Sequence, residues 1–146
     1  MQDDYSLGRE SHFDAMQEMG RDAWIDATNR STRFPPGTDE GLLAWYKGEF
    51  ASNRADMQAA MSKAMYAADI VQYLPRIEAP MLALYPTGGP RTGVEQEALL
   101  RKHVQRLSIV HLPSAFHKIQ LTHTASCAQQ LLHFMAQHDG RPCSEP

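Results

Sequence analysis

Histidine is the residue type in this sequence that is best suited to acid-base catalysis, because its imidazole accepts and donates protons near neutral pH. Of the seven histidines, His117 lies in a loop directly after an apolar segment that is typical of a strand. Such a loop holds a side chain at the edge of a sheet and leaves it accessible. His123 is the nearest alternative. His111 lies on the predicted strand itself, which favours a structural role. Three further histidines fall on predicted helices, where we expect them to be solvated or partly buried: His103, His133 and His138.

A metal site is not expected from these histidines. His111, His117 and His123 lack the spacing of about three to five residues that is typical of paired zinc ligands. Cys127 falls inside a predicted helix beside apolar residues, where a thiol is usually inert. The serines at positions 62, 108, 114 and 126 stand in no recognisable nucleophile motif.

Two groups of apolar residues admit two interpretations each. Trp24, Trp45 and Tyr46 either pack within a helical layer or line a substrate pocket. Met57, Met61 and Met65 recur at helical spacing, which favours helix packing but also suits an adaptable apolar pocket, because methionine is flexible. The Gly-Gly-Pro that begins at Gly88 is read as a turn after a strand, since neither glycine-rich phosphate-binding pattern is present.

Length and composition limit the classes of protein to which this chain can belong. The chain has 146 residues, a length that suits one domain. Hydrophobic residues make up 42%, enough for a folded core, and the net charge is -3. With no basic excess to neutralise phosphates, we expect no nucleic-acid partner.

The sequence also predicts a cytoplasmic protein without a membrane segment. No apolar stretch approaches the ~20 residues that span a bilayer. The start, MQDDYSLGRE, lacks the basic and apolar regions of a signal peptide. The two cysteines, Cys127 and Cys143, are too few for a disulfide framework.

The first half of the chain predicts helices. Ser11 begins a helical pattern that Gly20 divides into two short helices. RSTRFPPGTDE, which starts at Arg30, is predicted to be a loop because its prolines and glycine interrupt a helix. Thr38 or Asp39 is expected to cap a second helical segment, and Asn53 a third.

The second half predicts a strand, a helix, a strand and a last helix. MLALY (81–85) and LSIVHL (107–112) are short apolar runs that favour buried strands. Residues 94–104 form an amphipathic helix between them, and Pro113 to Leu121 is a predicted loop. A strand-helix-strand crossover makes its two strands parallel. A weaker alternative has both runs helical.

Residues 69–139 resemble the carboxyl-terminal end of an α/β-hydrolase. DIVQYLPRIEAPMLALYP is similar to the approach to the penultimate core strand, and LSIVHLP to the last strand. SAFHKIQL supplies the loop histidine, and TASCAQQLLHFMAQHDG the closing helix. The resemblance implies that His117 is the catalytic base. It also implies that the preceding helices form a cap over the active site.

The sequence departs from that family in its other catalytic parts. It contains no G-x-S-x-G nucleophile elbow, and PTGGPRTG stands where the family's acid is usual, so no carboxylate follows until Glu95. We therefore expect a fragment-like protein: a truncated product, an incompletely defined gene, or one piece of a split protein.

The resulting prediction is a partial α/β fold with a short parallel sheet. Residues 1–68 form a cap-like helical segment, 69–140 the end of a hydrolase core, and 141–146 a disordered tail. A complete enzyme would hydrolyse a small apolar ester or related carbonyl substrate without a cofactor, but this chain alone would be inactive. The alternative is a non-catalytic interaction module that self-associates or pairs with a complementing chain, because a two-stranded sheet has unpaired edges.

Overall fold

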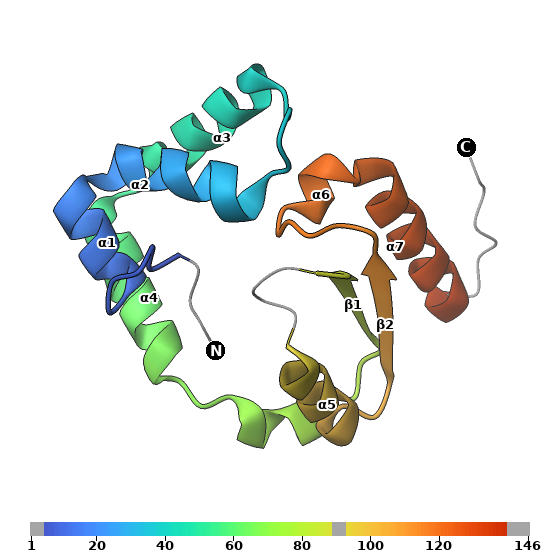
Figure 1. Cartoon of the computed structure of the whole chain (residues 1–146). Coiled ribbons are helices and arrows are strands. Elements are labelled where there is room, and N and C mark those ends of the chain that lie inside the picture. The colour runs from blue at the N-terminus through green and yellow to red at the C-terminus, as the bar shows by residue number, and fades with distance from the viewer. Residues whose placement is uncertain (1–4, 89–92, 140–146) are drawn as a thin grey trace. The chain divides into compact units, whose positions relative to one another are not determined.

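Helices dominate the chain, and its described β-structure is one pair of parallel strands (Figure 1). The structure is a computed structural model that describes residues 5–88 and 93–139. It divides into two compact units, Met1–Asp69 and Ile70–Pro146. The predicted tail, 141–146, lies outside the described residues. This arrangement is a mixed α/β fold, as expected.

The first two helices are separated as predicted at Gly20. Helix α1 (His12–Met19) is capped by Ser11, whose hydroxyl accepts a hydrogen bond from the backbone N–H of Asp14 at 3.2 Å. Helix α2 (Arg21–Thr28) follows at once. Gly20 ends α1 and precedes α2 with a φ of 84°, a value that glycine adopts without steric cost.

The segment after α2 corrects the predicted loop. Helical structure continues through a π-helical turn, η1 (Asn29–Arg33), before Phe34 becomes extended. The prolines stop the helix, but the four residues before Phe34 belong to it. Asp39 then caps helix α3 (Glu40–Ser52), because its carboxylate accepts the Leu42 N–H at 2.9 Å.

Helix α4 (Ala55–Ala67) begins after Arg54. Asn53, the predicted cap of this helix, instead ends α3, where its side-chain amide donates to the carbonyl of Glu49 at 3.1 Å. The amide thus satisfies an acceptor at the end of one helix and leaves the next without a side-chain cap.

The core of the first unit lies around α1 and α2. Tyr5, Ala15, Trp24 and Ile25 are buried together, and the Trp24 indole N–H donates to the carbonyl of Tyr5 at 2.7 Å. For Trp24, the interpretation as packing within a helical layer is therefore correct. Trp45 does not pack in this layer, since it is 53% exposed on α3.

The second unit is a strand-helix-strand crossover flanked by helices. A 3-10 helix, η2 (Val71–Arg76), leads to β1 (Met81–Pro86), then α5 (Val94–His103) and β2 (Leu107–Leu112). The strands pair in parallel with Met81 opposite Leu107 and Tyr85 opposite His111. This confirms the predicted strands and excludes the all-helical alternative for them.

The chain after β2 contains one helix that the sequence did not predict. Pro113 to Leu121 was expected to be a loop, but α6 (Ile119–Thr122) forms at its end around buried Ile119. Helix α7 (Thr124–Asp139) follows, as expected. No helix within residues 5–88 and 93–139 has the length and apolar character needed to cross a membrane.

Candidate functional site

The carboxyl ends of β1 and β2 lie at the same edge of the sheet, and hydrogen bonds hold their following loops together. The N–H of Thr87 donates to the Leu112 carbonyl at 2.9 Å, and the N–H of Gly88 donates to the Ser114 carbonyl at 3.0 Å. In open α/β sheets this edge is where ligands usually bind. The pair of loops is therefore the first place to look for a functional site.

Ser114 shapes the β2 loop rather than presenting a free hydroxyl. Its Oγ accepts a hydrogen bond from the Phe116 N–H at 3.1 Å and lies 3.2 Å from the Phe116 carbonyl oxygen, to which it donates. This local turn leads the chain into His117, which is half-buried. The predicted base thus stands in the loop that follows β2, between this turn and α6.

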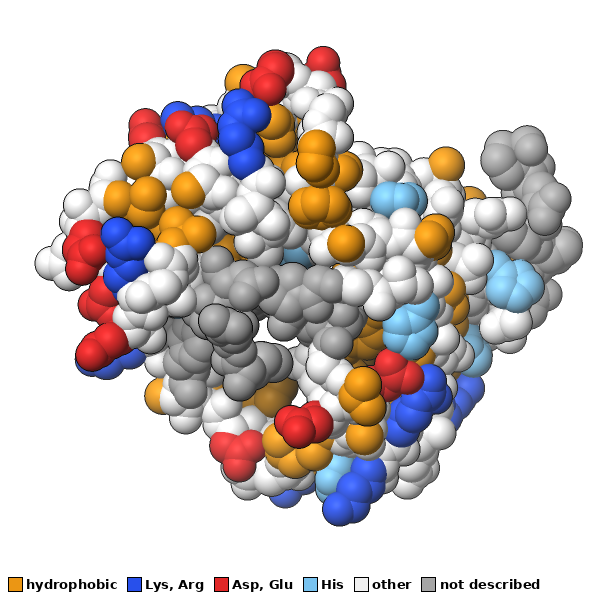
Figure 2. Space-filling model, in the orientation of Figure 1, with side chains coloured by type: hydrophobic (Ala, Val, Ile, Leu, Met, Phe, Trp, Pro, Cys, Tyr) orange, Lys and Arg blue, Asp and Glu red, His pale blue; other side chains and the backbone are white. Residues whose placement is uncertain are grey.

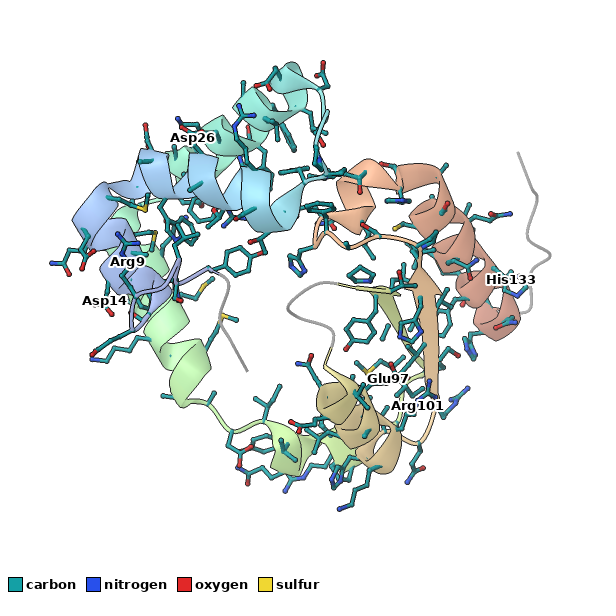
Figure 3. The ribbon with its side chains drawn as sticks, viewed as in Figure 1. Arg9, Asp14, Asp26, Glu97, Arg101 and His133 are labelled. Carbon is teal, nitrogen blue, oxygen red and sulfur yellow. The ribbon has the colours of Figure 1, made fainter. Side chains whose placement is uncertain are left out.

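The other histidines of the second unit have different surroundings. His123 ends α6, where its Nδ1 lies 2.9 Å from the hydroxyl of Thr122. His133 contacts Gln137 on the exposed side of α7, with Nε2 2.9 Å from the amide nitrogen (Figure 3). Both contacts are local to one helix, so they indicate no shared site with His117.

A second cluster of titratable groups lies between α5 and the sheet. His111 Nε2 is 2.9 Å from Glu97 Oε2, and the ring of His111 stacks with the ring of Tyr85 at a centroid distance of 6.2 Å. Arg101 donates twice to Glu97 Oε1, at 2.9 and 2.7 Å (Figure 3). Sequence reasoning did not find this cluster, although the register of two parallel strands places Tyr85 beside His111.

Charge and burial shift the pKa values of two of these groups. The hydrogen bonds from Arg101, followed by the charge and hydrogen bond of His111, lower the pKa of the Glu97 carboxyl. Burial raises the pKa of the Tyr85 hydroxyl, and the negative charge of Glu97 adds to this effect. The cluster therefore keeps Glu97 ionised and Tyr85 neutral over a wide pH range.

In the first unit, Arg33 is surrounded by aromatic rings. Its side chain is 4% exposed, and its guanidinium carbon lies 4.8 Å from the ring centres of both Tyr5 and Trp24. It also donates to Thr28 Oγ1 and, at 3.4 Å, to Asn29 Oδ1. Cation–π attraction and hydrogen bonds stabilise the buried charge, and the π-helical turn η1 places it there.

The described residues contain no metal centre. No group of three or more His, Cys, Asp or Glu side chains in residues 5–88 and 93–139 is arranged to hold a metal ion. Cys127 is half-buried on α7, and burial raises the pKa of its thiol. A raised thiol pKa disfavours the reactive thiolate.

Comparison of the chain with known protein families, curated proteins and solved structures gave no match. The fold therefore defines the class of this protein only as mixed α/β.

Proposed function

We propose that this chain supplies the histidine-bearing edge of an α/β-hydrolase-type active site, with His117 as the general base. The substrate class is a small, largely apolar ester or related carbonyl compound. The serine nucleophile comes from a polypeptide segment outside these 146 residues, because the sequence has no G-x-S-x-G elbow.

The observation that carries this proposal is the joining of the two strand-end loops. Hydrogen bonds from Thr87 and Gly88 fix the β1 loop to the β2 loop at the carboxyl edge of a parallel sheet. A base must stand beside the reacting atoms and be held there by its surroundings. The turn at Ser114 supports this requirement, because it constrains the backbone that carries His117.

The proposed reaction needs no cofactor. A serine hydroxyl from the complementing segment attacks the substrate carbonyl while His117 removes its proton. The same histidine returns that proton to the leaving alcohol, which leaves an acyl-serine. Water then attacks the acyl-serine, again with His117 as base. His117 returns this proton to the serine oxygen as the acyl–oxygen bond breaks and the acid is released.

Labelling with a fluorophosphonate probe tests the proposal. The purified chain should show no covalent serine labelling and no ester turnover, since it lacks the nucleophile. If any serine of this chain were labelled, Ser114 would be the first candidate, because it lies three positions before His117 in the sequence. Labelling that disappears in Ser114→Ala would show that the chain carries its own nucleophile, and the proposal would be wrong.

A second candidate is a non-catalytic module that binds other strands. The specific observation is the sheet itself, which has two strands and no further pairing among residues 5–88 and 93–139. The backbone N–H groups of Met81 and Thr87 donate toward β2. Successive N–H groups of a strand point in opposite directions, so those of Leu82 and Leu84 point to the outer edge of β1, the side away from β2. Unpaired edge groups of this kind recruit another strand.

Amide hydrogen exchange tests this second candidate. If the outer edge of β1 is paired in solution, the Leu82 and Leu84 amides should exchange slowly in concentrated protein and rapidly after dilution. The inward Ala83 amide is the control, because its bond to β2 lies within one chain. Rapid exchange of Leu82 and Leu84 at every concentration would exclude self-pairing at this edge.

A further inference from the structure

Helix α4 carries a row of exposed methionines. Met57, Met61 and Met65 are 58%, 64% and 69% exposed, so the stripe is not the packed helix interface that its spacing favours. Apolar side chains also reach the surface on the face seen in Figure 2. Ala60 and Ala64 beside the stripe are exposed as well. Small residues next to flexible ones let another helix approach closely.

The stripe is symmetric about Met61. Met57 lies about one helical turn before it and Met65 about one turn after it, since a turn takes about 3.6 residues. If a second α4 is laid antiparallel across Met61, each Met57 faces Met65 of the second copy. Twofold self-complementarity of this kind is what a symmetric dimer requires.

The charges at the two ends of α4 are also complementary. The amino end gathers two guanidinium groups: Arg54 pairs with Asp56 at 2.5 Å, and Arg21 donates to the Asn53 carbonyl at 3.1 Å. The carboxyl end is followed by Asp69. Asp69 stands beyond the carboxyl end of its own helix, where the dipole disfavours a carboxylate, whereas Arg54 at the amino end shares its charge with Asp56. Beside an antiparallel copy, each stands next to an end of opposite sign.

We propose that α4 is a homodimerisation helix, which pairs antiparallel with α4 of a second copy through Met57, Met61 and Met65. The proposal is independent of the hydrolase function, because it uses no residue of the sheet edge. The partner is a second copy of this chain, because the apolar stripe and the charges at the two helix ends are both self-complementary in an antiparallel arrangement.

Sedimentation equilibrium of the full chain over a concentration series tests the dimer. Met61→Glu should weaken association at least about ten-fold, because two carboxylates would meet on the twofold axis. Met135→Glu on α7 is the matched control, since Met135 is also exposed and apolar but lies outside the stripe. A monomer at all concentrations, or equal effects of both substitutions, would overturn the proposal.

Charge reversal provides a test that does not disturb the stripe. Arg54→Glu and Asp69→Lys should each weaken the dimer about two- to five-fold, as expected for exposed ion pairs. The double variant should recover most of the loss, since the opposed charges are exchanged but still opposite. Loss in the double variant that equals the sum of the single losses would contradict the pairing of these two ends.

Disulfide trapping decides the direction of the helices. In a background of Cys127→Ser and Cys143→Ser, Met61→Cys should cross-link readily, because the two copies meet there. Met57→Cys should not, since the two positions would be about 12 Å apart along the axis at ~1.5 Å per residue, too far for a disulfide. Efficient cross-linking of both variants would indicate parallel helices and overturn the antiparallel dimer.

Discussion

Glu97 of the crossover helix α5 bonds His111 of β2, with Oε2 and Nε2 2.9 Å apart. The bond ties the middle of the strand-helix-strand unit to its last strand, and Arg101 holds the same carboxylate from one helical turn away. Because β1 presents Tyr85 beside His111 and their rings stack, this hydrogen bond and the ring contact together connect all three elements of the crossover. We expect this cluster to contribute to the pH dependence of stability.

Acidification should remove the contribution of Glu97. The folded-state pKa of Glu97 is lowered, chiefly by Arg101, so its carboxylate stabilises the fold above the ordinary glutamate pKa. This stabilisation is lost as pH falls through the folded pKa. Glu97→Gln should therefore lower the thermal unfolding midpoint at about pH 6, and the difference from wild type should shrink toward about pH 3.

Glu95→Gln is the matched control for that measurement. Glu95 lies on the same helix and is exposed. Its substitution should change the midpoint less at pH 6. If Glu97→Gln and Glu95→Gln behave alike across the pH range, the contacts to Arg101 and His111 contribute nothing to stability.

Alkaline titration should reveal Tyr85 as a late-ionising tyrosine. Burial raises its folded-state pKa, so the folded state retains a proton that the unfolded state loses. Stability is then complete below the ordinary tyrosine pKa of about 10 and falls as pH rises through the folded value. Ultraviolet difference absorbance of the native chain should show a late phase that is absent from Tyr85→Phe. A late phase that persists in this variant would assign it to another tyrosine.

The amino end of α3 depends on one side chain. Asp39 accepts the Leu42 N–H at 2.9 Å, so Asp39→Ala should destabilise the chain by about 1 kcal/mol in denaturant unfolding. Asp39→Asn should retain nearly all of the stability, since asparagine caps as well as aspartate. An equal loss in both variants would show that the carboxylate charge, rather than the hydrogen bond, stabilises this end.

Core truncation should separate the buried and exposed apolar residues. Ile25 is 0% exposed, so Ile25→Ala should cost about 2–5 kcal/mol of unfolding free energy. Val94 is 87% exposed, and Val94→Ala should stay within about 0.5 kcal/mol of wild type. Circular dichroism in a denaturant series measures both. A small effect of Ile25→Ala would mean that α2 is not packed as described.

The local signals in this sequence were strong where a residue acts on its own neighbours. Gly20 separates α1 from α2 because its backbone adopts a positive φ without steric cost. Asp39 caps α3 because its short side chain places the carboxylate within reach of the Leu42 N–H. The two apolar runs formed β1 and β2 with the expected parallel pairing. By contrast, η1 was missed because a π-helical turn has no distinctive composition, and Asn53 was assigned to the wrong helix because an amide serves either helix end.

The sequence by itself determined both strands, most of the helices and the mixed α/β class, since helix caps, turns and apolar runs act over a few residues. Only the tertiary structure decided which side chains meet. It brought Glu97 to His111, placed Arg33 among the rings of Tyr5 and Trp24, and left Met61 on the surface. These outcomes depend on how elements pack against one another, and residue spacing along one element carries no information about that.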